Sequence, residues 1–157
     1  IWHAWKLKEE NKTIDQIVKW LESNKLNLIH LFTVDDLGTL KRGGRLSDTQ
    51  AFLGGLLRIK PILHVDDQGR LVPLKKARGR SFSLESMVEL MSDKIVDAEK
   101  QTIFISHGDC LEEAKQVGQM VIDKYHVKEV LYNEIGPVVG AHSGPGTIAI
   151  FFMGNKR

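Results

Sequence analysis

The chain has 157 residues, of which 42% are hydrophobic and 27% charged, values typical of one domain with a sizeable core. Its net charge of +2 gives no general attraction to nucleic acid or anionic membranes, and no apolar run approaches the roughly 20 residues of a membrane-spanning helix. We therefore expect no nucleic-acid partner and no stable membrane insertion, and the single cysteine, Cys110, excludes an internal disulfide and favours a reducing, cytoplasmic location.

The first element along the chain is predicted to be helical. The opening segment IWHAWKLKEENK has neither an initiator methionine nor an apolar signal-peptide core, so we expect a fragment or processed chain that starts within a helix. Thr13 and Gln16 then fit a capping box, and apolar residues recur at helical spacing through Leu21. Residues 28–34 (LIHLFTV) are apolar on both faces, which predicts a central strand.

The next segment, from residue 40 to residue 77, predicts a short helix and then a hairpin. Gly43 and Gly44 interrupt the chain, and Ser47 with Gln50 forms a second possible capping box before a helix over residues 51–57. Two apolar runs joined by DDQG then predict a β-hairpin. These runs are residues 59–65 (IKPILHV) and 71–77 (LVPLKKA). Each contains a proline, which belongs at a strand start, an edge or a bulge.

The second half of the chain alternates helices and strands. Ser83 is expected to cap a helix whose apolar stripe runs from Leu84 to Ala98, and Asp109 with Glu112 fits a third capping box. Further elements are predicted as a helix over residues 111–125 and strands over residues 102–106, 127–132 and 147–153. About six strands in this order predict an α/β fold with a mixed sheet packed against helices.

Two loops concentrate positive charge. LKRGGRLS places Arg45 beside the Gly43–Gly44 pair and just before a predicted helix start, where an anion is favoured. PLKKARGRS has four cations between Lys75 and Arg80, and strand alternation puts Lys76 and Arg78 on one face. Each loop is interpreted either as an anion or partner site or as solvated charge, and the second also as protection of an edge strand.

The stretch GPVVGAHSGPGTIAIFFMG, residues 136–154, sets one histidine among small residues before an apolar run. Gly140 and Gly144 allow close approach of the backbone, while His142 and Ser143 supply hydrogen-bonding groups that suit a carboxylate or phosphate. The alternative is a glycine-rich turn whose histidine bonds to backbone.

Other chemical signals in the chain are weak. His107 and Cys110 form a possible Cys–His pair without a third group, and a small buried cysteine is the favoured interpretation. His30 and His64 lie inside strands and are interpreted as satisfied core or face residues. No zinc-protease motif, nucleotide-binding loop or CxxC pair is present, so we expect no metal and no cofactor.

Taken together, three motifs resemble the DegV family closely: DDLGTLKRGGRLSDTQAFLGGLLRIKPIL, then ARG, then GPVVGAHSGPGTIAIFF. These are bacterial fatty-acid-binding proteins, several of which act as the lipid-carrying subunit of fatty acid kinase. The resemblance covers essentially the whole chain. One small difference is Thr39, where the family commonly has an aromatic residue.

The resemblance also implies a domain organisation. DegV proteins have two α/β domains and nearly twice this length, and the second carries these motifs on a mixed six-stranded sheet. Residues 26–157 would be that second, C-terminal domain, and residues 1–25 a remnant of the connecting helical segment. The N-terminal domain, with its serine- and threonine-bearing carboxylate motifs, has no counterpart here.

The same resemblance implies roles for individual residues. His142 matches the histidine near the bound carboxylate, while Arg45 and Arg78 match basic positions linked to docking of the kinase subunit near the head group. The helix over residues 51–57 and the adjacent strands would supply part of the acyl tunnel. With Ser143, Gly144 and Gly140, His142 forms the predicted ligand-binding set.

The leading hypothesis is thus a lipid-binding protein and not an enzyme, with a long-chain fatty acid as ligand and catalysis in a partner kinase subunit. The alternative hypothesis is an enzyme acting on a small phosphorylated or carboxylated metabolite. In it His142 is the general acid/base and Arg45 and Arg78 hold the anion. Ser143 is the only evident nucleophile beside His142, and adjacent residues rarely meet as nucleophile and base.

Overall fold

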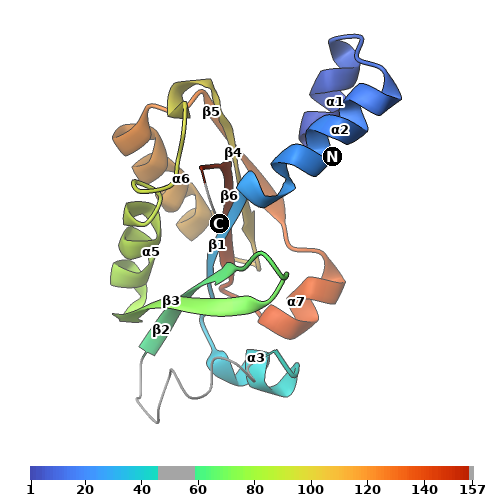
Figure 1. The fold of residues 1–157 in the computed structure, drawn as a ribbon. Helices are drawn as coiled ribbons and strands as arrows, with labels where there is room; N and C mark the ends of the chain where they lie inside the picture. Colours follow the sequence, from blue (N-terminus) through green and yellow to red (C-terminus); the bar gives the residue numbers. More distant parts are fainter. Residues whose placement is uncertain (46–58, 156–157) are drawn as a thin grey trace.

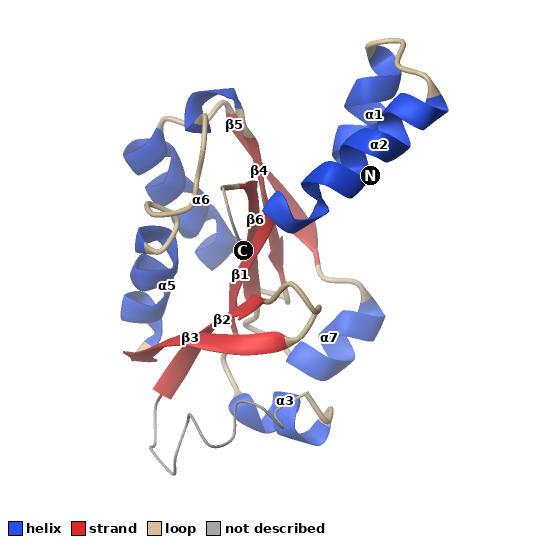
Figure 2. Ribbon diagram, in the orientation of Figure 1, coloured by secondary structure: helices blue, strands red, loops and turns tan. Residues whose placement is uncertain are grey.

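The computed structural model describes residues 1–45 and 59–155, and its centre is a six-stranded sheet in the order β3-β2-β1-β6-β4-β5 (Figures 1 and 2). The strands are β1 (Leu28–Thr33), β2 (Ile59–Val65), β3 (Leu71–Arg78), β4 (Thr102–His107), β5 (Glu129–Glu134) and β6 (Ile148–Met153). The helices are α1 (Trp2–Glu9), α2 (Ile14–Asn24), α3 (Leu37–Arg42), α5 (Arg80–Glu89), α6 (Leu111–Tyr125) and α7 (Pro137–Ser143). The predicted mixed α/β fold is confirmed.

The N-terminal helices α1 and α2 form a hairpin that extends away from the sheet (Figure 1). The capping box is confirmed at Thr13, whose side chain accepts from the Gln16 N–H while the Gln16 side chain accepts from the Thr13 N–H. The ring of Trp2 meets Phe104 of β4 edge-on, with their centroids 5.6 Å apart. This contact ties the hairpin to the sheet. A short 3₁₀ turn, Lys25–Asn27, leads from α2 into β1.

The first half of the sheet is antiparallel. β1 pairs with β2, and β2 pairs with β3, as the hairpin prediction required. The register shifts between Ile62 and Leu63, where Ile62 faces Lys75 but Leu63 faces Pro73. Pro73 therefore stands in an edge strand beside a bulge, where a missing N–H costs no central ladder bond.

The second half of the sheet contains a parallel pair of strands, and the last strand of the chain pairs alongside it. β4 and β5 are parallel and are joined through α6, while β6 lies antiparallel between β4 and β1. The pairing of β1 with β6 runs over the full length of both strands, from Leu28 opposite Met153 to Thr33 opposite Ile148. The two halves are thus joined at the centre of the sheet.

The two faces of the sheet are covered differently. Alternate residues of β1, such as Ile29 and Leu31, face α5 and α6 and belong to a large core that also contains Ile105 and Ile150. Phe32 points to the opposite face and packs in a smaller cluster with Leu40 of α3. Among residues 1–45 and 59–155, no helix covers most of that second face (Figure 1).

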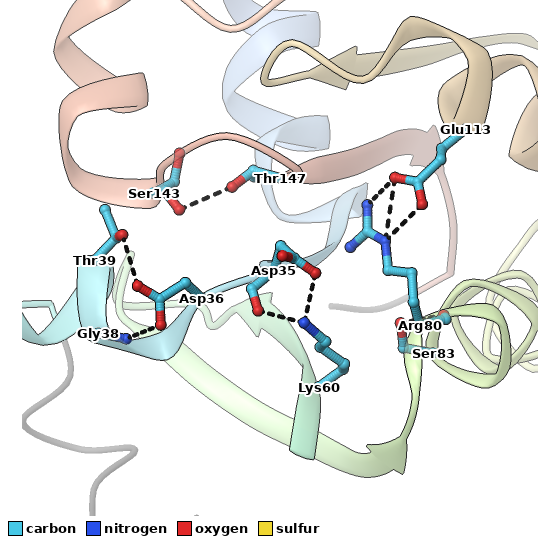
Figure 3. Close-up of polar contacts among 10 residues, drawn as sticks. All are labelled: Asp35, Asp36, Gly38, Thr39, Lys60, Arg80, Ser83, Glu113, Ser143 and Thr147. Carbon is cyan, nitrogen blue, oxygen red and sulfur yellow. Dashed lines mark hydrogen bonds and ion pairs between the residues drawn. The ribbon is translucent and has the colours of Figure 1, made fainter. Parts of the chain in front are cut away.

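An ion pair joins the two helices of the covered face. The guanidinium of Arg80, at the start of α5, donates through Nε and Nη2 to the carboxylate of Glu113 in α6, with an Nη2–Oε2 distance of 2.7 Å (Figure 3). The Arg80 side chain is 17% exposed, so this contact is partly screened from water.

Two predicted helix caps are wrong, and one of the two helices also begins earlier than expected. α5 begins at Arg80 after Gly79, and Ser83 lies inside it, donating to the Arg80 carbonyl. The helix then ends at Glu89, before the end of its predicted apolar stripe. α6 begins at Leu111 as expected, but its cap position belongs to Cys110 without a side-chain cap bond, and Asp109, with a positive φ of 51°, lies one residue before that position. The predicted helix over residues 51–57 and its Ser47–Gln50 cap lie outside the described residues.

Within the described residues, no helix combines the length and the apolar composition that a membrane crossing requires.

Candidate functional site

A cleft of about 630 Å³ lies on the sheet face opposite α5 and α6. Its floor is formed by side chains of the central strands, among them Phe32 of β1, Ser106 of β4 and Phe151 of β6. α7 and the end of α3 stand beside it and contact each other (Figure 1). The volume falls within the usual range of small-molecule sites, about 300–1,000 Å³.

The lining of the cleft is largely apolar and includes several polar and charged side chains. Apolar side chains include those of Phe32, Leu40, Val65, Leu71, Ile135 and Phe151. Polar and charged ones include those of Arg45, Ser106, Asn133, Glu134, His142 and Ser143. This arrangement suits an apolar ligand that carries one polar head group.

The segment for which a glycine-rich turn was the alternative interpretation is helical over α7. Pro137 occupies the first turn, where its missing N–H costs nothing, and the helix ends at Gly144 with φ 81°. The side-chain hydroxyl of Thr147 then donates to the carbonyls of Ser143 and Gly144, at 3.0 and 2.9 Å (Figure 3). The turn interpretation was therefore wrong for residues 137–143, since proline and glycine stand at helix start and stop positions.

The last turn of α7 brings two polar side chains to the cleft. Ser143 is 6% exposed and its Oγ is buried, and the Nδ1 atom of the half-buried His142 is buried as well. Neither atom has a hydrogen-bond partner within residues 1–45 and 59–155. Ser143 Oγ and His142 Nδ1 are therefore not bonded to each other, and the nucleophile–base pair needed by the enzymatic alternative is not formed through these atoms.

The first turn of α3 is fixed next to the end of α7. Asp36 accepts from the Gly38 N–H at 2.8 Å, and this hydrogen bond is the main reason why the pKa of Asp36 lies below its usual range (Figure 3). Thr39 packs against Gly144, where an added Cβ would lie 3.0 Å from the Thr39 methyl group. The residue that differs from the family pattern thus sits directly against the end of α7.

The loop that leads into β6 is held on two sides. Gly146 donates to the carbonyl of Gly108 at 2.7 Å, and a Cβ on Gly146 would lie 2.6 Å from Cβ of Asp35. Asp35 is in turn paired with Lys60 of β2 (Figure 3). These contacts fix the loop that follows α7.

The basic residues of the two charged loops are not brought together. Arg45 is exposed and lines the cleft, with its Nη1 donating to the carbonyl of Gly43 at 2.9 Å. Arg78 is exposed at the end of β3 and is absent from the cleft lining, on the same strand face as Lys76. Gly140 lies inside α7, where its carbonyl accepts from the Gly144 N–H at 2.8 Å.

Some residues that line the cleft were not predicted from the sequence to belong to the site. His30 was interpreted as a satisfied core or face residue, yet it faces the cleft and its ring meets Phe151 edge-on at 5.2 Å. Asn133 and Glu134 enter from the end of β5. The available signal was strand alternation, which puts His30 on the opposite face from Ile29, together with the tendency of ligands to bind at the carboxyl ends of parallel strands.

The possible Cys–His pair lies outside the cleft. His107 is 5% exposed, and its Nδ1 accepts from the Cys110 backbone N–H at 3.4 Å. Burial raises the pKa of the Cys110 thiol, which disfavours a reactive thiolate. In the described part of the chain, no three histidine, cysteine or acidic side chains are grouped to hold a metal ion.

Comparison with known proteins gives consistent matches. A family model described as "Uncharacterised protein, DegV family" matches residues 1–155. A DegV domain-containing protein of Clostridium perfringens is 46% identical over 157 residues, which are 100% of this chain and 54% of that protein. The chain spans about half the length of the curated relatives it matches.

Solved structures match over nearly the whole chain. A DegV family protein of Ruminococcus gnavus, refined with vaccenic acid, has a TM-score of 0.86 and 25% identity, covering 95% of this chain and 53% of that one. DegV of Bacillus subtilis, described as a fatty acid binding protein, has a TM-score of 0.75 and 36% identity, covering 95% and 53%.

Proposed function

The chain belongs to the DegV family, and from this premise we propose that it supplies one half of a binding site for a long-chain fatty acid. The carboxylate lies at the end of α7 and the acyl chain along the apolar part of the cleft. The bound lipid is then presented to a kinase subunit that phosphorylates its carboxylate. Catalysis, ATP and metal belong to that partner.

The observation that carries the proposal is the buried hydroxyl of Ser143, next to His142 at the end of α7. Ser143 Oγ lacks a partner within the described residues, in a cleft that is otherwise mainly apolar and that His142 also lines. A buried polar group without a hydrogen bond costs about 1–3 kcal/mol. A carboxylate beside Ser143 would accept from its hydroxyl, and the second ring nitrogen of His142 would supply another donor.

The apolar lining supports an acyl chain as the rest of the ligand. Phe32, Leu71 and Phe151 present carbon surface on the open side of the sheet. Each methylene moved from water into such surroundings contributes about 0.8 kcal/mol, so a long chain gains far more than a short one. This favours a long-chain acid over a small carboxylated metabolite.

The length of the relatives supports a second domain that covers the cleft and completes the binding site. Because the chain covers 54% of its Clostridium perfringens relative, full-length members have room for another domain. We propose that this domain closes over the uncovered sheet face and contributes the remaining carboxylate donors. Residues 26–157 are then the C-terminal domain, and residues 1–25 belong to the connection.

The exposed arginines support the kinase part of the proposal. Arg45 stands at the cleft and Arg78 at the end of β3, both reachable from outside. Phosphorylation of the carboxylate adds negative charge, which a guanidinium accommodates well. Arg45 is assigned to the phosphorylated head group and Arg78 to the surface of the partner.

The test is the identity and retention of the ligand. We expect protein purified from a bacterial host, as this chain and as a full-length relative, to release a fatty acid detected by mass spectrometry. After delipidation, a long-chain acid should displace a fluorescent fatty acid, while the alcohol of equal length should compete much less. Absence of fatty acid from the full-length protein, or equal competition by the alcohol, contradicts the proposal.

A further inference from the structure

The end of α3 lies against the imidazole of α7. If Gly43 carried a Cβ, that atom would lie 2.8 Å from Nδ1 of His142, 3.2 Å from its Cα and 3.3 Å from its Cβ. Cβ atoms essentially never approach a heavy atom within 3.0 Å, so the methyl group of an alanine would displace the ring. The space between α3 and α7 is therefore wide enough for glycine only.

Gly43 is not required by its backbone conformation. Its φ of −74° and ψ of −2° are right-handed helical values that any residue adopts. Gly44 shows the opposite case, with φ +69° and no atom of the described residues within 4 Å of its added Cβ. The two adjacent glycines thus separate two requirements: Gly43 provides space for His142, and Gly44 provides the turn.

The contact with Gly43 restricts how His142 meets a ligand. Nδ1 is buried on the α3 side without a partner among the described residues, so Nε2 is the ring nitrogen left for the cleft. Gly43 also accepts the hydrogen bond from Arg45 Nη1 through its carbonyl, at 2.9 Å. One residue therefore contacts the imidazole and holds the guanidinium at the cleft.

We propose that Gly43 is a positioning residue for His142, and this inference rests on the proposed binding of a carboxylate at the cleft. Its missing side chain lets the imidazole lie against α3, with Nε2 directed at the head group of the lipid. Any larger side chain turns the ring away from that group. Gly43 itself makes no contact with the ligand.

The first test is a double-mutant cycle between Gly43→Ala and His142→Ala, read as fatty acid affinity. We expect Gly43→Ala alone to weaken binding about tenfold, or about 1.4 kcal/mol. In the His142→Ala background the same change should alter affinity less than about twofold, because a positioning residue acts only through the ring. Equal losses in both backgrounds, or no loss in the first, overturn the proposal.

The matched control is Gly44→Ala, which strains the turn but meets no neighbour among the described residues. It should lower stability and leave the affinity of the folded protein nearly unchanged. If Gly43→Ala does not fold, the double variant with His142→Ala should fold, because it loses the 2.8 Å contact with Nδ1 and keeps only the longer ones to Cα and Cβ of residue 142, at 3.2 and 3.3 Å. Failure of that double variant to fold also overturns the proposal.

A readout independent of lipid separates this inference from the proposed function. In ¹⁵N spectra of the ligand-free protein, Gly43→Ala should shift the His142 ring nitrogens and Gly44→Ala should leave them in place. If the wild-type protein binds no fatty acid but this pattern is found, the proposed function fails and the positioning role of Gly43 stands. Unshifted ring signals in Gly43→Ala reject the positioning role whatever the protein binds.

Discussion

At the scale of single residues, His142 is the group on which the proposed head-group site depends most. We expect His142→Ala to weaken fatty acid binding about 10- to 100-fold, because a hydrogen bond to a charged group contributes about 1.5–3 kcal/mol. Displacement of a fluorescent fatty acid measures the change. His126→Asn is a suitable control, since that exposed left-handed residue at the end of α6 lies outside the cleft. Equal effects of both substitutions would refute the assignment.

Arg78 allows docking of a kinase to be separated from lipid binding. Because it is exposed and does not line the cleft, Arg78→Ala should leave fatty acid affinity unchanged and lower kinase-dependent acyl phosphate formation about fivefold. Product formation with a purified fatty acid kinase is the measurement. Lys76→Ala, on the same face of β3, is the matched control and should have little effect. Loss of lipid binding in Arg78→Ala would argue against a docking role.

Much of the candidate site could be predicted from local sequence, but not its geometry. The glycine-rich stretch pointed to His142 and Ser143, and both line one cleft. The contact of Gly43 with the imidazole was not foreseen, because it joins two helices that are distant in the sequence. His30 was missed for a related reason: alternation tells which residues share a face but not which face stays open.

At the scale of elements, the packing of α6 on β5 depends on a glycine inside the helix. A Cβ on Gly118 would lie 2.0 Å from the hydroxyl oxygen of Tyr132, so Gly118→Ala should destabilise the protein by about 1–3 kcal/mol through overpacking. Urea unfolding measures the change, and Tyr132→Ala should restore part of the loss.

The control is Gly140→Ala in α7. That glycine is also helical, but its nearest neighbour would lie 3.9 Å from the added Cβ. The substitution should be neutral or stabilising by up to about 1 kcal/mol, because alanine favours the helix. Similar behaviour of the two glycines would mean that contact with Tyr132 does not limit the helix–strand distance.

Periodicity and turn chemistry were enough to predict the strands and the longer helices, but not the short helices α3 and α7 or the helix caps of α5 and α6. The hairpin of β2 and β3 follows from DDQG between two apolar runs, and the capping box at Thr13 forms as expected. Ser83 and Asp109 also have capping chemistry, yet neither caps a helix. α5 begins earlier, directly after Gly79, where Arg80 meets Glu113. That ion pair links residues far apart in the sequence, beyond the reach of a local pattern.

At the scale of the whole molecule, two partly buried acidic groups set an alkaline limit to stability. Burial raises the pKa of Cys110 and that of Tyr132 above their ordinary values, so the folded state keeps both protons to higher pH than the unfolded state. Their contribution to stability is complete below those ordinary values and is lost as the pH rises through the raised ones. We expect the free energy of unfolding in urea to fall steadily above about pH 9.

Replacement of both side chains tests whether Cys110 and Tyr132 cause the loss of stability at high pH. A Cys110→Ala and Tyr132→Phe double variant should show a flatter alkaline limb than the wild-type protein. Tyr132→Phe alone should alter only the part near and above about pH 10. An unchanged slope in the double variant would show that other groups cause the loss.

The pairing of β1 with β6 has a consequence for synthesis of the protein on the ribosome. The β2–β3 hairpin and the β4–α6–β5 unit can each form from neighbouring residues, but the strands that join them, β1 and β6, are the first and the last strand along the described chain. Until β6 leaves the exit tunnel, the nascent chain holds two partial sheets with unpaired edges, the state in which chaperones bind and in which aggregation starts. Because its central pairing is also its longest-range one, the domain is expected to complete folding slowly and only after β6 has left the ribosome.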